Sequence, residues 1–152
     1  MLERRAFLGL GAAFATTWSL GGAGATELRR VEMRIRVALP PTLGEARIRV
    51  VPLRASGMIV SADTSIESDA DLVEHDGAGP VSAWWRPGAL APRLMVITRL
   101  AIPENVEITA LARPEPWAET PAGRVVWSEA PGPCYSLDFI DLSAPWGPQP
   151  LV

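Results

Sequence analysis

Cysteine, histidine and lysine are almost absent from this sequence. Its 152 residues include one cysteine, Cys134, one histidine, His75, and no lysine. With a single cysteine, no disulfide can form within the chain. A blue-copper site needs two histidines and a cysteine, and a structural zinc site needs four good ligands, so neither can be assembled here. The sequence therefore predicts no metal site and no cofactor, and a fold held together by packing.

Positive charge is also in short supply. The 14 basic residues, all arginines, are outnumbered by 17 acidic residues, which gives a formal net charge of −3 at pH 7. Proteins that bind nucleic acid or anionic lipid draw much of their affinity from a basic surface that neutralises phosphates. We therefore expect no nucleic-acid partner for this chain.

The first residues carry a pattern that is typical of export. A short charged start with the pair Arg4 and Arg5 is followed by an apolar run that contains Phe7 and Leu8. A charged region followed by an apolar region is the order found in signal peptides. These four residues resemble the Arg-Arg-x-Phe-Leu core of bacterial twin-arginine (Tat) signals, which a receptor reads as an address. The resemblance implies export through the Tat translocon and a periplasmic or secreted location.

The apolar run ends at a candidate cleavage site. Ala23 and Ala25 are small residues three positions before and one position before a cut after Ala25, as signal peptidases require. The alternative is an uncleaved anchor, because residues 6–25 approach the ~20 residues that span a bilayer. Five glycines and three hydroxyl residues make this run weakly apolar for a permanent span. We therefore expect cleavage and no stable membrane anchor.

The rest of the chain has the alternation of β-strands. In residues 31–39 every odd position is apolar, and residues 46–53 repeat the alternation. Period two with one charged face is typical of a half-buried strand. Pro40, Pro41 and Gly44 lie between the two segments, so we expect them to form an antiparallel pair. Further strands are predicted at residues 57–62, 70–74, 81–85, 93–102, 106–111, 123–127 and 134–142.

Other segments extend this all-β pattern. Residues 93–102 are almost continuously apolar, which predicts a central strand covered on both faces. The corner at residues 103–105 predicts a hairpin between that strand and residues 106–110. Prolines around residues 115–120 leave room for no more than one helical turn.

Three regions follow from this pattern. Residues 1–25 are predicted to be the Tat signal helix, and residues 26–143 an antiparallel β-sandwich of about seven to nine strands. Residues 144–152 contain three prolines and are predicted to be an extended C-terminal tail unless they dock on the sandwich.

The acidic segment 67–76 is one candidate for chemistry. It contains Asp69, Asp71 and Asp76, together with three further acidic or histidine side chains. Carboxylate oxygens at this density are suited to Ca²⁺, although the spacing does not match an EF-hand loop. The alternative interpretation is a solvated acidic loop at the edge of a sheet.

A second candidate is a thiol enzyme or small hydrolase that uses Cys134 and His75. Nucleophilic catalysis requires the nucleophile and its base to lie within hydrogen-bond reach. The one histidine would have to serve every such scheme, and no Gly-x-Ser-x-Gly motif is present. Cys134 also suits a small buried side chain at the start of a strand. We assign no catalytic residue from the sequence.

Tryptophan is the third candidate feature. In a strand, Trp84 and Trp85 must point to opposite faces, so one of them is expected to be exposed unless both faces are covered. An exposed tryptophan beside Arg86 would suit a protein partner or a carbohydrate. The alternative is packing in the core and at the sheet edge. After residue 25 the sequence contains only one tyrosine but five tryptophans, at positions 84, 85, 117, 127 and 146.

The order of elements resembles a known family. Two strands, the second ending in Val50-Val51-Pro52-Leu53, precede a polar stretch and a strand that follows Trp84-Trp85. Over residues 29–112 this order resembles the N-terminal β-sandwich of bacterial transglutaminase-like proteins. The resemblance implies an immunoglobulin-like domain that, in that family, precedes a catalytic Cys-His-Asp domain. We expect that catalytic domain to be missing here, and Cys134 matches no nucleophile motif of the family.

Together these patterns predict an exported, non-catalytic binding or accessory module. A protein partner in the periplasm, as in a subunit of a larger complex, is one expectation. The alternatives are the thiol enzyme that uses Cys134 and His75, and calcium binding by residues 67–76.

Overall fold

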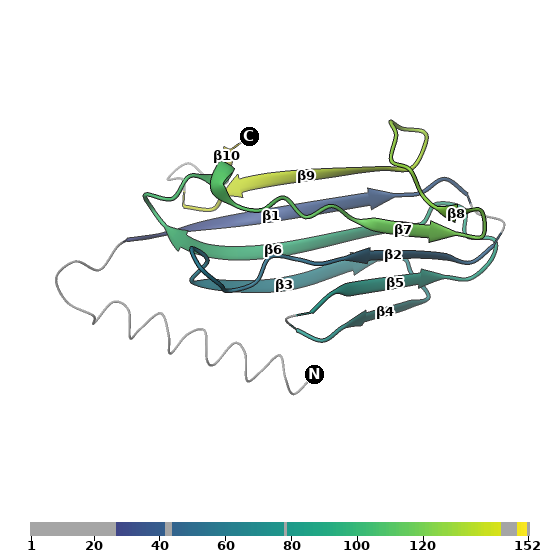
Figure 1. The fold of residues 1–152 in the computed structure, drawn as a ribbon, viewed down its shortest axis with the longest axis horizontal. Helices are drawn as coiled ribbons and strands as arrows, with labels where there is room; N and C mark the ends of the chain where they lie inside the picture. The colour runs from purple at the N-terminus through teal and green to yellow at the C-terminus, as the bar shows by residue number, and fades with distance from the viewer. Residues whose placement is uncertain (1–26, 42–43, 78, 144–148, 152) are drawn as a thin grey trace.

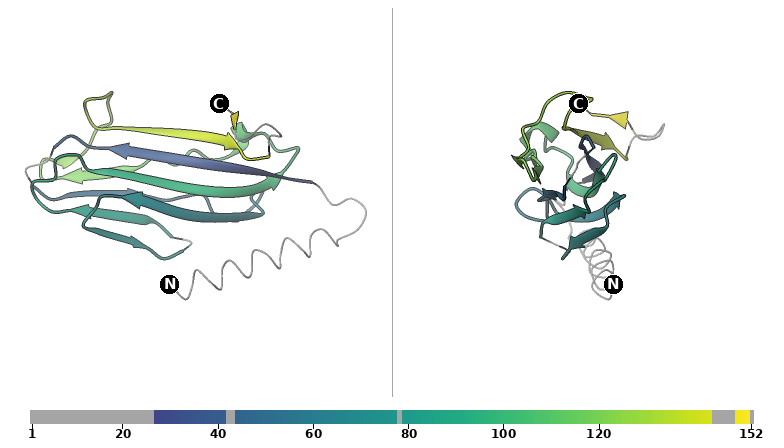
Figure 2. Two further views of the ribbon diagram at one scale, coloured as in Figure 1. Left: turned by 180° about the vertical axis from the view of Figure 1, so that it is seen from behind. Right: turned by 90° about the vertical axis from the view of Figure 1, so that its right-hand side faces the viewer.

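The structure is a computed structural model that describes residues 27–41, 44–77, 79–143 and 149–151. The predicted twin-arginine motif and cleavage site lie outside these residues. The described residues form two five-stranded sheets packed face to face (Figures 1 and 2). In chain order the elements are β1 (Leu28–Ala38), β2 (Ala46–Val50), β3 (Ser61–Ser68), β4 (Leu72–His75), β5 (Val81–Trp85), β6 (Arg93–Pro103), the 3₁₀ helix η1 (Ile108–Ala110), β7 (Trp117–Thr120), β8 (Gly123–Arg124), β9 (Cys134–Asp141) and β10 (Gln149–Pro150).

All strand pairs between these elements are antiparallel. Sheet A has the order β10-β9-β1-β6-β3, and sheet B has the order β4-β5-β2-β7-β8. The pairs are nested along the chain, since β4 pairs with β5, β3 with β6, β2 with β7 and β1 with β9. Successive nested pairs alternate between the sheets, so the chain winds around one shared core. The central strands are therefore β1 and β2, while β3 and β4 lie at edges.

The prediction of an all-β antiparallel sandwich is confirmed. The ten strands exceed the predicted seven to nine because β8 and β10 are two-residue pairings at the sheet margins. In the C-terminal tail, β10 pairs with the end of β9, so that part of the tail docks on sheet A.

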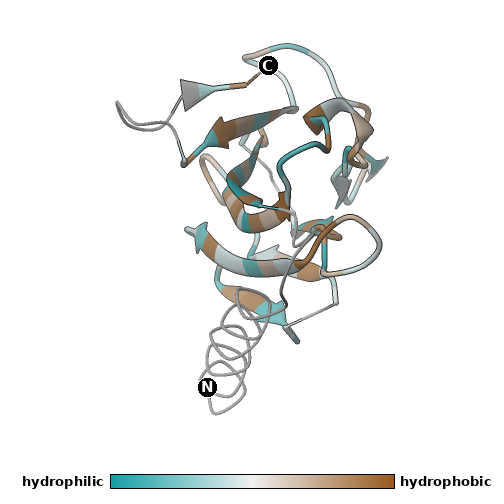
Figure 3. Ribbon diagram, turned by 90° about the vertical axis from the view of Figure 1, so that its left-hand side faces the viewer, coloured by the Kyte–Doolittle hydropathy of each residue, from teal (hydrophilic) through white to brown (hydrophobic). Residues whose placement is uncertain are grey.

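The two central strands share one sequence. Arg-Ile-Arg-Val occurs at residues 34–37 in β1 and again at residues 47–50 in β2. The isoleucines and valines of both copies are buried in a single core, while the arginines lie on the two outer faces. Figure 3 shows the resulting alternation of apolar and polar residues along the strands. Burying each of these aliphatic side chains contributes roughly 1.5–3 kcal/mol.

The predicted pairing of residues 31–39 with residues 46–53 is wrong. β1 pairs with β6 and β9, whereas β2 pairs with β5 and β7. Because both strands carry one apolar face, they bury it best by facing each other across the core. The connection ends at Gly44, where a Cβ would lie 2.1 Å from Cγ of Pro121 in the turn between β7 and β8. That close approach places the start of β2 in sheet B.

The predicted hairpin after β6 is also wrong. β6 lies in the interior of sheet A, as predicted, but its neighbours are β1 and β3. Residues 106–111 form a turn and η1, in which Ile108 and Leu111 enter the core while Thr109 and Ala110 are exposed. Two apolar anchors three residues apart suit a 3₁₀ turn, in which positions i and i+3 share a face.

Three smaller expectations also need correction. β6 is not covered on both faces, because its buried residues alternate with half-buried residues and with exposed Arg93 and Arg99. The strand predicted at residues 57–62 begins at Ser61 and runs to Ser68, so the polar residues Asp63 and Ser65 belong to edge strand β3. Residues 117–120 form β7 rather than a helical turn, because they pair with β2 and bury Ala118.

Glu32 is buried although it lies on the outer face of sheet A. Arg99 is its cross-strand neighbour on β6, and Arg34 follows it on β1. Nε of Arg34 lies 2.5 Å from one carboxylate oxygen of Glu32, and Nε of Arg99 lies 3.2 Å from the other. Burial by itself raises the pKa of Glu32, but the hydrogen bonds and positive charges of the two arginines outweigh it and lower the pKa below 4.5.

We expect Glu32→Gln to destabilise the fold by about 1–2 kcal/mol at pH 7, because charged hydrogen bonds are lost and the two arginines are only partly screened by water. A lowered pKa in the folded state stabilises the fold above the unfolded value and ceases to do so as pH falls. The difference from wild type should therefore shrink below about pH 4.5. Urea unfolding between pH 3 and pH 7 measures it.

Asp63→Asn is the matched control, since Asp63 is exposed opposite Arg99 on the same face. We expect it to change the free energy of unfolding by less than about 0.5 kcal/mol. A cost of Glu32→Gln that stayed constant down to pH 3 would contradict the account of Glu32.

Candidate functional site

Trp84 and Trp85 point to opposite faces of β5, as the alternation predicts. Trp85 is 3% exposed, and its Nε1 donates a hydrogen bond of 2.9 Å to Oδ1 of Asp69. Arg86 is exposed beyond the end of the strand, and its backbone N–H donates to Asp71. The predicted surface of Trp84, Trp85 and Arg86 is therefore not assembled, because Trp85 belongs to the core.

Trp84 instead lies on the outer face of sheet B, with neighbours that the sequence did not reveal. Its cross-strand neighbours are Leu72 on β4, which is 51% exposed, and Arg47 on β2. Across β2, Arg47 faces Glu119 of β7, and the adjacent residue of β7 on this face is Trp117. We call this set of five residues (Leu72, Trp84, Arg47, Trp117 and Glu119) the tryptophan face.

Arg47 organises the centre of the tryptophan face. Its guanidinium carbon lies 5.3 Å from the centre of the Trp117 ring, within the range of a cation–π contact. Its Nη2 lies 3.5 Å from Oε2 of Glu119. Both contacts are with residues of β7, while Trp84 is the cross-strand neighbour of Arg47 on β5. The face therefore presents aromatic surface, one cation and one anion on rigid strands.

Trp127 has a structural role. Its Nε1 donates a hydrogen bond of 3.0 Å to the carbonyl oxygen of Pro116. Its ring meets that of Tyr135 edge to face, with centroids 5.3 Å apart. Trp127 thus links the segment after β8 to β9 and packs against the core.

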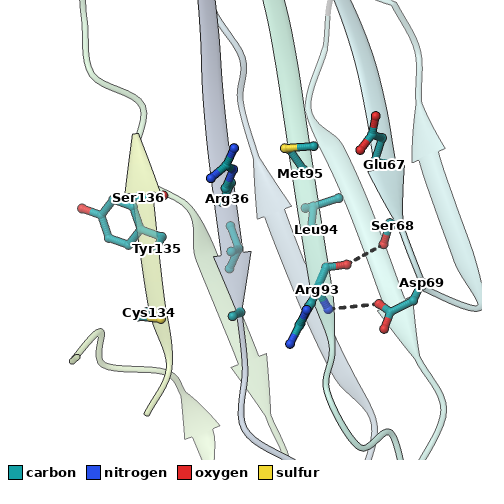
Figure 4. A pocket seen from close by; sticks show the side chains of 12 residues that line it. Arg36, Glu67, Ser68, Asp69, Arg93, Leu94, Met95, Cys134, Tyr135 and Ser136 are labelled. Atoms are coloured by element: carbon teal, nitrogen blue, oxygen red, sulfur yellow. Dashed lines mark hydrogen bonds between the residues drawn. The ribbon is translucent and has the colours of Figure 1, made fainter. Parts of the chain in front are cut away.

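The outer face of sheet A carries a shallow trough of about 760 Å³ at the end where β6 and β9 begin. In one row across the sheet, Cys134 and Arg93 flank the small side chain of Ala38. In the next row, Ser136, Arg36, Met95 and Glu67 follow one another on β9, β1, β6 and β3. Figure 4 shows Arg36, Met95 and Glu67 on three neighbouring strands. The trough exists because Ala38 leaves a gap among larger side chains.

The charges that line the trough are of two kinds. Arg36, Arg93 and Glu67 are exposed, and within the described part of the chain none of them has an ion-pair partner within 4.0 Å. Asp69, by contrast, accepts hydrogen bonds from Trp85 and from the backbone N–H of Arg93, at 2.9 and 3.0 Å. The arginines and Glu67 are therefore available to a ligand, whereas Asp69 is part of the framework.

Cys134 and His75 are not brought together. Cys134 is half-buried on β9, beside the trough. His75 lies on β4 of the other sheet and lines a separate slot with Ile66, Ser68 and Val73. Ile66 and Ser68 of β3 line the slot of His75, and three strand spacings, roughly 14 Å, separate β3 from β9 in sheet A. The two side chains therefore lie far beyond hydrogen-bond reach. This geometry gives no support to a catalytic pair of Cys134 and His75.

The acidic segment 67–76 uses its carboxylates locally. Asp69 binds Trp85 and Arg93, Asp71 binds the backbone of Arg86, and Asp76 accepts from the backbone N–H of Gly79 at 2.7 Å. Among the residues that the structure describes, no three His, Cys, Asp or Glu side chains are grouped so that they could hold a metal ion. These carboxylates act as hydrogen-bond acceptors in the loops next to β4.

Asp69 links both sheets, because Trp85 belongs to sheet B and Arg93 to sheet A. We expect Asp69→Ala to lower the free energy of unfolding by about 1–3 kcal/mol, since the buried Nε1 of Trp85 loses its acceptor. Asp69→Asn keeps an acceptor oxygen and should cost clearly less. Chemical denaturation followed by tryptophan fluorescence tests both variants. Equal stability of Asp69→Ala and wild type would show that the hydrogen bond is dispensable.

Comparisons with protein-family models, with curated proteins and with solved structures gave no match to this chain. Across the described residues, none of the helical structure has the length and apolar character needed to cross a bilayer.

Proposed function

We propose that this chain is an exported, non-catalytic binding or accessory module, and that the tryptophan face is its contact surface. The N-terminal resemblance to twin-arginine signals supports a periplasmic or secreted location. The observation that carries the proposal is the placement of Trp84 and Trp117 on either side of Arg47 on an exposed sheet face.

The composition of the tryptophan face supports a role in contact. Tryptophan and arginine are enriched among the residues that dominate binding energy at protein interfaces. A partly exposed indole ring gains apolar burial when a flat partner group covers it, whether the ring of a sugar or a side chain of a protein. No other feature of the described residues concentrates two indole rings on one outward surface.

The rigidity of the tryptophan face favours binding as well. Arg47 already contacts Trp117 and Glu119, which restricts its side chain and lowers the entropy lost on association. Neighbouring β-strands support every residue of the face. We favour a periplasmic protein partner, with a carbohydrate as the alternative ligand of the same surface.

The test uses the protein purified after export from its own host and immobilised as bait for periplasmic and cell-surface material. We expect a stoichiometric protein or a glycan to be retained. Trp84→Ala and Trp117→Ala should each weaken its binding at least tenfold, since a buried aromatic hot spot contributes about 2 kcal/mol or more. Titration of the identified ligand against each variant gives the dissociation constants.

Leu90→Ala is the matched control, because Leu90 is 80% exposed but lies outside the tryptophan face. It should bind as wild type does, and all variants should unfold at similar denaturant concentrations. If the tryptophan variants were folded and bound the ligand with unchanged affinity, the face would not be the contact surface.

A further inference from the structure

We propose that the trough on sheet A binds a short zwitterionic peptide, with its carboxylate between Arg36 and Arg93 and its ammonium group at Glu67. This site is on the opposite sheet from the tryptophan face and does not depend on it. The proposal rests on the lining of the trough, on charged side chains that have no ion-pair partner among the described residues, and on the spacing of the strands that carry them.

The arginines supply the anion site. Arg36 on β1 and Arg93 on β6 are diagonal neighbours on the same face, with Met95 and Ala38 completing the square. Long side chains in diagonal positions of an antiparallel pair can reach the same ligand group. Guanidinium groups without an ion-pair partner bind carboxylates in paired hydrogen bonds. The gap above Ala38 leaves space for such a carboxylate.

Glu67 supplies the opposite charge. It faces Met95 from edge strand β3 and has no ion-pair partner among the described residues. β3 and β1 are two strand spacings apart, which is about 10 Å. An extended peptide advances about 3.3–3.6 Å per residue, so a molecule of two or three residues spans the trough from the arginines to Glu67.

The floor of the trough suits the middle of such a ligand. Met95 lies between Arg36 and Glu67 and is half-buried, so it offers an adaptable apolar contact. Ser136 adds a hydroxyl group beside Arg36 on the far side from Met95. A purely anionic ligand would be repelled by Glu67, whereas a zwitterion satisfies both ends.

The experiment titrates the full exported protein with triglycine and follows binding by calorimetry at low ionic strength. N-acetyl-triglycine, which lacks the ammonium group, and triglycine amide, which lacks the carboxylate, are the paired probes. We expect saturable binding of triglycine at millimolar or lower concentration and at least tenfold weaker binding of both analogues.

Variants locate the binding. Arg36→Gln and Arg93→Gln should weaken triglycine binding at least tenfold, and Glu67→Gln should remove the preference for triglycine over its acetylated form. Arg49→Gln is the matched control, because Arg49 is an exposed arginine on the outer face of sheet B. Binding should also slow the alkylation of Cys134 by iodoacetamide, since this thiol borders the trough.

Two results would overturn the proposal. One is the absence of saturable triglycine binding at millimolar concentration. The other is binding that Arg49→Gln weakens as much as Arg36→Gln does, or that N-acetyl-triglycine matches, since both indicate general attraction of anions to arginine. Neither result bears on the tryptophan face, whose variants should bind triglycine as wild type does.

Discussion

The structure depends on the burial of one aliphatic face from each central strand. The repeated Arg-Ile-Arg-Val sequence places Ile35 and Ile48 in the same core and turns four arginines outward. With no disulfide available, this apolar contact between sheets must provide most of the stabilisation. The outer faces are thereby left free to carry charge and aromatic groups, and both candidate sites lie on them.

Much of the fold follows from period-two alternation. The strand predicted at residues 81–85 matches β5 at both ends, and β1, β6 and β9 agree with prediction within a few residues. The pairing of strands did not follow, because alternation assigns each side chain to a face but does not identify the neighbouring strand. The strand predicted at residues 106–111 was wrong for a related reason, since the spacing of its apolar residues fits both a strand and a 3₁₀ turn.

The sites were less predictable than the fold. Alternation correctly separated Trp84 from Trp85, but the burial of Trp85 depends on Asp69, which reaches it from the connection between β3 and β4. The strand that carries Trp117 was not predicted, because prolines surround it and Trp117-Ala-Glu-Thr does not alternate apolar and polar residues. The trough needs the register of four strands, which no local pattern contains. Arg36 and Arg93 are 57 positions apart in sequence and become neighbours only through that register.

The edge strand β3 affects how readily two copies of the molecule associate. An unpaired strand edge is a template for further strands, and a long flat one invites aggregation. Along β3 the outward side chains of Asp63 and Glu67 each carry a negative charge. Two copies that joined edge to edge through β3 would bring these carboxylates together, and like charges on facing strands repel each other. The acidity of this edge thus opposes growth of the sheet from one molecule into the next.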